Sequence, residues 1–347
     1  MANPVRVLQV LADTDASAAN TAAMELHSAL SGAGVAMRTL ALAPGRWGAL
    51  ADTVPAIAPG RRSIAAHTQL HAEQRWADLV VLHGATVAAV AALAGGDLPQ
   101  VLVLWDEPQR WDGGARVPAR ARRLARRCAA VTVGWPAAVD AAARQLGVPA
   151  ERVHQAATPI TTTAVPTPAA RAAARAALGV SDSQLAVRLI AEPGAAGAAT
   201  SLSPGLSAAL PAAFDGGVLV LGPHGPSQMP EEQRRELERI AADVVVALDV
   251  GGGPSPEVLR TVSSGATLVA PAGPAIDGLL RDDLTGRVLP TPVTSDGLVA
   301  AVRSLAEPEL RSSLGDAARA AVHAQHGTEQ VRGRWLDLVH SALPSRP

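Results

Sequence analysis

The sequence contains no lysine and no tyrosine, and it has one phenylalanine and one cysteine among 347 residues. The single Cys128 excludes an internal disulfide and a zinc site built on several cysteines. No apolar run approaches the roughly 18 residues of a membrane span, and Asp13 interrupts the apolar N-terminal segment too early for a signal peptide. These absences predict a soluble, cytoplasmic protein. The absence of lysine is typical of a protein encoded by a very G+C-rich genome. We therefore attribute it to mutational bias rather than to a function.

The residues that are present are mainly apolar, and their charges balance. Hydrophobic residues make up 48% of the chain, and the formal net charge is −1. This length and composition predict two domains, each with a buried core. The balanced charge argues against a nucleic-acid partner held by phosphate contacts. Arginine supplies every side-chain cation except histidine, and six tryptophans supply nearly all of the aromatic surface.

Short apolar runs alternate with alanine-rich segments of helical periodicity along most of the chain. We expect strands at 5–12, 36–42, 77–84, 100–106, 129–135, 185–191, 217–222, 243–249, 266–271 and 287–290. A final helical stretch is expected from Asp296 to about Leu343. Continuously apolar strands separated by helices predict parallel sheets that are covered on both faces. Ligands of such sheets bind beyond the carboxyl ends of the strands.

The alternation breaks in a segment rich in threonine and proline, which predicts a linker at about 158–167. The expected domains are therefore residues 1–160 and residues 168–347, the second including the C-terminal helices. A last helix that crosses back to the first domain is the alternative. The first strand is not followed by a Gly-x-Gly-x-x-Gly fingerprint, which argues against a nicotinamide-dependent dehydrogenase.

Five segments, in chain order, resemble the family 4 glycosyltransferases of the GT-B fold. They are LGVPAERVHQAATPI from Leu146, TPAARAAARAALGV from Thr167, LVLGPHGP from Leu219, GLLRDDLTGRVLP from Gly278 and AEPELRSSLGDAARAAVHAQHGTEQVRGRWLDL from Ala306. The resemblance implies an α/β GT-B protein of two doubly wound Rossmann-like domains facing a cleft. The first would be the acceptor-side domain and the second the donor-side domain, and the activity would be retaining hexosyl transfer from a nucleotide sugar.

The residues that carry the family's chemistry are missing from the matching positions. The family's two glutamates, separated by seven residues, fall at Gly252 and Arg260. The family's arginine and lysine after the first strand of the second domain are replaced by Glu192 and small neutral residues. The glycine pair after the first strand of the chain falls near Ser17 and Ala18. Because cations stabilise the leaving diphosphate, these losses predict a decayed donor site.

We therefore expect a pseudoenzyme, a non-catalytic partner or scaffold of an active glycosyltransferase, with no catalytic residue, cofactor or metal. The alternatives are an active retaining transferase that holds its nucleotide-sugar donor through a rearranged site with Arg260, and a sensor that binds a small ligand. The vestigial donor residues would be Gly222, Gly225, Gly265 and Thr285. His83, at a strand end near the family's acceptor site, is either structural or functional.

The partner surface is expected on two tryptophans and a basic helix, because Trp and Arg dominate interface hot spots. Its residues would be Trp105, Arg110, Trp111, Arg116, Arg120, Arg123 and Arg127. The partner would be an active glycosyltransferase or a second copy of this chain. The arginines have two other interpretations, a solvated helix face and a peripheral contact with an anionic membrane.

Overall fold

The computed structural model describes residues 4–105, 119–161, 164–190, 208–222, 229–248, 253–273 and 276–344. The contacts divide the chain into unit 1, Met1–Pro159 with Thr328–Pro347, and unit 2, Ile160–Gly327. The division falls inside the segment where the sequence predicts a linker. The last helix belongs to unit 1 and not to the second domain, in line with the alternative of a crossing helix.

Unit 1 is built on a six-stranded parallel sheet in the order β2-β1-β3-β4-β5-β6. The strands are β1 Val5–Leu11, β2 Val35–Ala41, β3 Leu79–His83, β4 Gln100–Leu104, β5 Ala130–Val133 and β6 Val153–Gln155. The α-helices are α1 Ala18–Leu30, α2 Ile64–Gln74, α3 Ala85–Ala94, α5 Ala119–Ala125, α6 Ala138–Leu146 and α13 Thr328–Ala342. A short 3-10 helix, η1 Ala150–Arg152, precedes β6.

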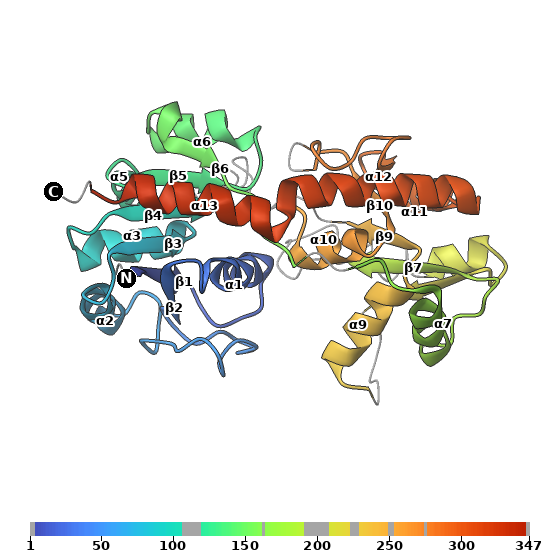
Figure 1. Cartoon of the computed structure of the whole chain (residues 1–347), viewed down its shortest axis with the longest axis horizontal. Coiled ribbons are helices and arrows are strands. Elements are labelled where there is room, and N and C mark those ends of the chain that lie inside the picture. Colours follow the sequence, from blue (N-terminus) through green and yellow to red (C-terminus); the bar gives the residue numbers. More distant parts are fainter. Residues whose placement is uncertain are drawn as a thin grey trace. The chain divides into compact units, whose positions relative to one another are not determined.

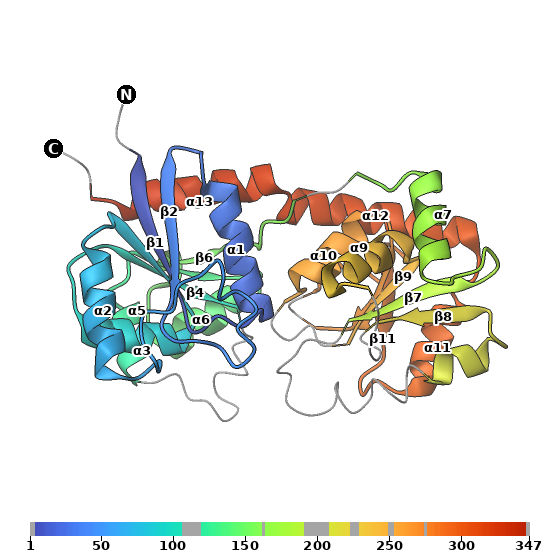
Figure 2. The ribbon, with the colours of Figure 1, turned by 90° about the horizontal axis from the view of Figure 1, so that it is seen from below.

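The core of unit 1 joins residues from both ends of the chain. Val7, Val81 and Val103 face the same side of the sheet and pack in one cluster with Trp335 of α13, which is 1% exposed. Helix α13 lies across this sheet beside α1 (Figures 1 and 2), and Arg332 of α13 donates a hydrogen bond to the carbonyl of Ala29 at 2.7 Å. The first domain is therefore completed by the end of the chain.

Unit 2 is built on a five-stranded parallel sheet in the order β11-β10-β9-β7-β8. The strands are β7 Leu185–Ile190, β8 Val218–Leu221, β9 Val244–Ala247, β10 Thr267–Pro271 and β11 Gly286–Leu289. The helices are α7 Pro168–Ala177, α9 Glu231–Ala241, α10 Pro256–Ser263, α11 Ser295–Arg303 and α12 Pro308–His326. The two sheets confirm the predicted parallel, doubly wound architecture.

Strand β9 shows why its sequence is apolar throughout. Val244 and Val246 pack in one core cluster with α11, whereas Val245 and Ala247 pack in another with α10 and α12. Because successive strand residues point to opposite faces, a strand covered on both sides needs apolar residues at every position.

The final helical stretch predicted from Asp296 to Leu343 consists of three helices, α11, α12 and α13. Pro308 occupies the first turn of α12, where its missing N–H leaves no hydrogen bond unmade. Gly327 separates α12 from α13, which is where the chain passes from unit 2 to unit 1. The stretch is therefore helical as predicted, in three separate helices.

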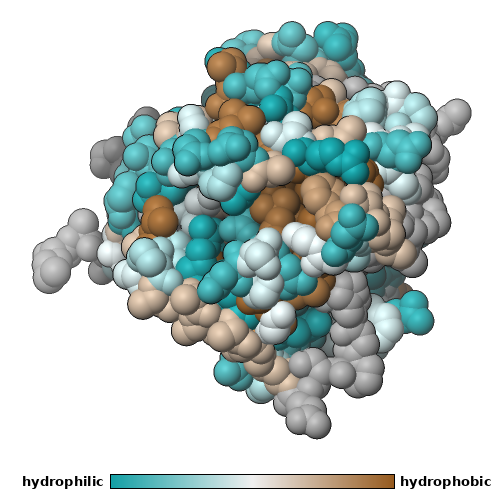
Figure 3. Space-filling model, turned by 90° about the vertical axis from the view of Figure 1, so that its right-hand side faces the viewer, coloured by the Kyte–Doolittle hydropathy of each residue, from teal (hydrophilic) through white to brown (hydrophobic). Residues whose placement is uncertain are grey.

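The molecular surface is mixed. On the face shown in Figure 3, small hydrophobic areas are divided by hydrophilic residues, as on most protein surfaces. Among the helices of the described ranges, none has the length and apolar character needed to cross a bilayer.

Candidate functional site

Helix α10 occupies the segment in which the resemblance places the second of the family's two carboxylates. Ser255 caps its N-terminus by accepting a hydrogen bond from the backbone N–H of Val258 at 3.3 Å, and Pro256 occupies its first turn. Arg260 lies on this helix, and Gly252 lies outside the described residues. Glu257 is the acidic residue of its first turn.

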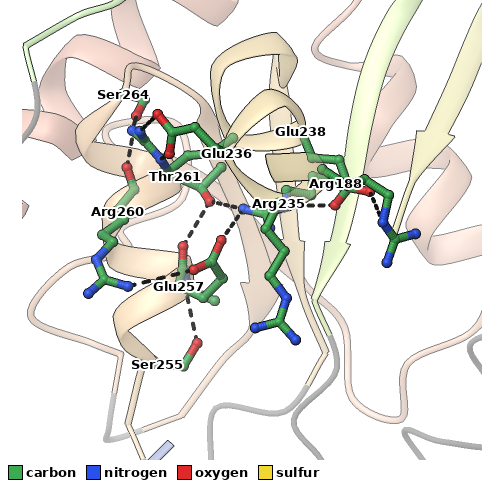
Figure 4. Close-up of polar contacts among 12 residues, drawn as sticks. Arg188, Arg235, Glu236, Glu238, Ser255, Glu257, Arg260, Thr261 and Ser264 are labelled. Atoms are coloured by element: carbon green, nitrogen blue, oxygen red, sulfur yellow. Dashed lines mark hydrogen bonds and ion pairs between the residues drawn. The ribbon is translucent and has the colours of Figure 1, made fainter. Parts of the chain in front are cut away.

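Arg188 of β7 contacts α10, and no motif in the sequence pointed to it as a site residue. It alternates along the strand with the core residues Val187 and Leu189, pairs in register with Val245, and is 3% exposed. Its guanidinium lies 2.6 Å from Glu257 and donates to the Thr261 hydroxyl at 2.7 Å (Figure 4). A second carboxylate, Glu238 of α9, lies 3.6 Å away. An arginine in an otherwise apolar strand was the sequence signal for this network.

The charges around Arg188 neutralise one another. Glu257 also pairs with Arg260 at 3.8 Å, and in Figure 4 these two side chains of α10 point toward each other. Burial lowers the pKa of Arg260. Glu238, 5% exposed, also lies 3.8 Å from Arg234. A buried carboxylate is tolerated only when it is paired, so these arginines serve the fold of unit 2.

The described vestigial donor residues have structural uses. Gly222 follows β8 and its carbonyl accepts from Arg234 at 3.2 Å. Gly265, with φ +96°, forms the turn between α10 and β10. The Thr285 hydroxyl donates to the carbonyl of Leu279 at 2.7 Å and accepts from the N–H of Arg281 at 2.8 Å. Gly225 lies outside the described residues.

In unit 1, acidic residues fill the turn after β1, just before the position of the family's glycine pair. Ser17 caps α1, and the carboxylate of Asp15 accepts the backbone N–H groups of Arg46, Trp47 and Gly48 at 2.9, 2.6 and 3.0 Å. Partial burial would raise the pKa of Asp15, but these hydrogen bonds from Trp47, Gly48 and Arg46 outweigh it and lower the pKa. The turn therefore presents a carboxylate, bound to its own chain, near the position where the family binds a sugar nucleotide.

His83 and Trp105 form a buried pair at the ends of β3 and β4. The Trp105 indole N–H donates to Nδ1 of His83 at 3.2 Å, and the two rings stack with 6.1 Å between centroids. Complete burial lowers the pKa of His83 to about 3, so its ring is neutral at physiological pH. No described residue bonds its Nε2 atom. His83 is therefore held by the fold as a neutral ring.

The structure brings only part of the expected partner surface to the exterior. Trp105 is 8% exposed and packs in the unit 1 core, whereas the anchor of a partner surface needs an accessible side chain. Arg120, Arg123 and Arg127 are exposed at α5, and none of them forms a salt bridge with a described residue. Arg110, Trp111 and Arg116 lie outside the described residues.

No group of three or more potential ligands within the described ranges is arranged to hold a metal ion. The polar chemistry of the described site therefore consists of the arginine–carboxylate network of unit 2 and the Asp15 turn of unit 1.

Solved structures resemble the whole chain. HepE from Anabaena in complex with UDP and glucose superposes with a TM-score of 0.76 at 14% identity, covering 97% of this chain and 100% of that one. A glycosyltransferase from Rickettsia africae gives 0.72 at 10% identity, covering 99% and 100%. WaaG, a glycosyltransferase of lipopolysaccharide biosynthesis, gives 0.66 at 14% identity, covering 96% and 99%.

These likenesses define the class of fold. Two parallel-sheet Rossmann-like units, of six and five strands, match GT-B glycosyltransferase structures over nearly their full length. The chain therefore has the GT-B fold. No family model matches the sequence, and no curated protein matches it.

Proposed function

We propose that the chain is a GT-B protein with a decayed nucleotide-sugar site that acts as a non-catalytic partner or scaffold of an active family 4-like glycosyltransferase. The observation that carries this proposal is the network of Arg188, Glu238, Glu257 and Arg260. Glu257 and Arg260 of this network lie on helix α10, where the resemblance places a catalytic carboxylate, and the two arginines of the network face two glutamates.

The electrostatics of donor binding support this proposal. A nucleoside diphosphate brings about two negative charges, and the departing diphosphate needs preorganised cations. Recruiting Arg188 for that task would weaken its pairing with Glu238, a carboxylate that is 5% exposed and depends on nearby cations. In unit 1, the carboxylate of Asp15 would repel a phosphate that approached the same turn.

The first test is donor binding by calorimetry. The purified chain would be titrated with UDP, UDP-glucose and guanosine diphosphate sugars, with HepE, which has been crystallised with UDP-glucose, as the positive control. We expect heat of binding with HepE and none with this chain at micromolar ligand. A micromolar dissociation constant for any of these donors would overturn the decayed site.

An active retaining transferase is the second candidate. Its support is the position of Arg260, a cation on helix α10 where the family has a glutamate, in a fold that spans the full length of HepE. In that case a nucleotide sugar binds, and Arg260→Ala abolishes its turnover. Comparing donor hydrolysis by the wild-type chain and by Arg260→Ala separates the two candidates.

The double variant Gly252→Glu/Arg260→Glu should not gain activity. It restores both family carboxylates, but it adds negative charge beside Glu257 and supplies no cation for the diphosphate. The measurement is release of UDP from UDP-glucose, with circular dichroism as the control for folding. Turnover by the double variant that is absent from the wild-type chain would contradict the proposal, because it would make the missing cations dispensable.

The partner of a non-catalytic GT-B chain would be an active glycosyltransferase, and a second copy of this chain is the alternative. The exposed arginines Arg120, Arg123 and Arg127 support an acidic partner or a peripheral contact with anionic lipid at α5. Co-purification from the native host, compared with flotation on anionic vesicles, distinguishes these two uses of the helix.

A further inference from the structure

The connection between β2 and α2 in unit 1, residues 42–63, is long for an α/β fold. Connections of this kind usually have about 2–6 residues, and much longer ones are commonly functional. The connection starts at the carboxyl end of β2, the edge of a parallel sheet where ligands and partners bind. No motif in its sequence indicates a role.

Contacts with the β1–α1 turn hold this connection in one shape. Besides the three N–H groups that Asp15 accepts, the N–H of Gly45 donates to the Thr14 hydroxyl at 2.9 Å, and that of Leu50 to the Thr14 carbonyl at 2.8 Å. A Cβ atom at Gly45 would lie 2.2 Å from the Asp15 carboxylate, so only glycine fits this approach. Arg61 ties the far end of the connection to Asp13 at 3.0 Å.

The connection so held exposes large apolar side chains. Trp47 is 76% exposed and Ile64, the first residue of α2, is 83% exposed, whereas the core encloses Trp105, Trp135 and Trp335. The guanidinium of Arg46 lies 4.9 Å from the centre of the Trp47 ring. Arg46 forms no salt bridge with any residue in the described part of the chain. We call Arg46 and Trp47 the Trp47 surface.

We propose that the Trp47 surface is the docking site for a protein partner whose contact face is an apolar pocket rimmed by carboxylates. The proposal rests on the partner dependence in the proposed function and names the surface that serves it. Trp and Arg are the residues most enriched in interface hot spots. The guanidinium of Arg46, stacked on Trp47 and in no salt bridge with a described residue, is complementary to carboxylates at the rim of such a pocket.

The rigidity of the connection favours a protein over a lipid bilayer. Binding to a bilayer scales with buried apolar area and with charge, and a fluid surface gains nothing from a fixed loop shape. A protein pocket does gain, because preorganisation removes the entropy cost of ordering the loop on binding. The contacts of Asp15 and Thr14 supply that order before any partner arrives.

The test begins in the native host with the full-length protein carrying a photo-crosslinking amino acid in place of Trp47. The crosslinked protein is identified by mass spectrometry and purified. Calorimetry then measures its affinity for the wild-type chain, Trp47→Ala, Arg46→Glu and the control Leu93→Ala, which shortens another exposed apolar side chain of unit 1. We expect a loss of about thirtyfold or more for Trp47→Ala and no loss for Leu93→Ala. When a carboxylate of the partner that faces Arg46 is replaced with Arg, the partner should bind the Arg46→Glu variant again, because the two charges are then reversed.

Each outcome decides the proposal. Equal affinity of all variants, no specific crosslink, or Trp47-dependent binding to phosphatidylcholine–phosphatidylserine vesicles in place of a protein would each overturn the docking site. A partner that binds elsewhere leaves the proposed function standing. UDP-glucose turnover by the purified chain overturns the proposed function instead, while the variant series still decides the surface.

Discussion

At the scale of single residues, burial sets what each ionisable side chain can do. His83 is fully buried with a pKa of about 3 and accepts the indole N–H of Trp105 on Nδ1. A ring that stays neutral cannot act as a proton donor near pH 7. Cys128 is comparable, since burial raises the pKa of its thiol to about 12 and removes the reactive thiolate.

His83 should make the stability of unit 1 depend on pH. Its folded pKa lies below its ordinary value of 6.5, so between about pH 6.5 and 3 the unfolded chain binds more protons and stability falls as the pH is lowered. The slope of the unfolding free energy against pH approaches about 1.4 kcal/mol per pH unit.

His83→Asn keeps a hydrogen-bond acceptor for Trp105 and removes the titrating ring. Urea unfolding from pH 8 to 5 should therefore show a weaker dependence of the unfolding free energy on pH for the variant. His154→Asn, on the exposed side of β6, is the control. Identical profiles for wild type and His83→Asn would contradict the assignment.

At the scale of elements, the buried ion network joins strand β7 to helices α9 and α10. Arg188 contacts Glu257 and Thr261 on α10 and Glu238 on α9, so one side chain holds three elements in register.

Replacing Arg188 with methionine should destabilise unit 2 by about 3–5 kcal/mol, because Glu238 is buried and would lose its closest cation. Chemical denaturation measures the loss. In the triple variant Arg188→Met/Glu238→Gln/Glu257→Gln, which also removes the carboxylates, most of the stability should return. A triple variant as unstable as Arg188→Met would contradict this explanation, because it would show that the loss of stability comes from packing and not from an unpaired charge.

Two helical glycines give a matched pair. A Cβ atom at Gly315 of α12 would lie 2.6 Å from the carbonyl oxygen of Gly265, whereas one at Gly333 of α13 meets nothing within 4 Å. We expect Gly315→Ala to destabilise unit 2 by about 1–3 kcal/mol through overpacking. Gly333→Ala should stabilise unit 1 by about 0.5–1 kcal/mol, because alanine loses less entropy in a helix. Thermal unfolding of both variants checks the opposite signs, and shifts of the same sign would contradict the close packing of α12 on the turn between α10 and β10.

At the scale of the whole molecule, the C-terminal helix decides the integrity of the first domain. Trp335 of α13 lies in the core with Val7 and Val103 and is 1% exposed. The GT-B fold of this chain therefore contains one domain assembled from two separate segments.

Trp335→Ala should destabilise unit 1 by about 3–5 kcal/mol through loss of a large buried side chain and leave unit 2 intact. Hydrogen exchange resolves the two units, with faster exchange expected in β1, β3 and β4 and unchanged exchange in β7 and β9. Trp47→Ala, at an exposed position, should change stability by no more than about 0.5 kcal/mol. Loss of protection in both units would contradict the independence of their cores.

The sequence by itself determined the fold class, because apolar strands and alanine-rich helices are local patterns with characteristic periods. The parallel sheets were predicted from the absence of polar positions in strands such as β9. The absence of lysine, and of a carboxylate at Gly252 and Arg260, is also evident from the sequence, because residue identities need no coordinates.

Only the tertiary structure decided the environment of each side chain. It buried Trp105 and exposed Trp47, although both follow strands in the sequence, because exposure depends on what the rest of the chain packs against. It brought Arg188 into contact with Glu257, 69 residues later in the sequence, and Arg332 near the end of the chain into contact with Ala29 near its start. Such long-range pairings have no local period, so burial, charge pairing and pKa could be assigned only after the chain had folded.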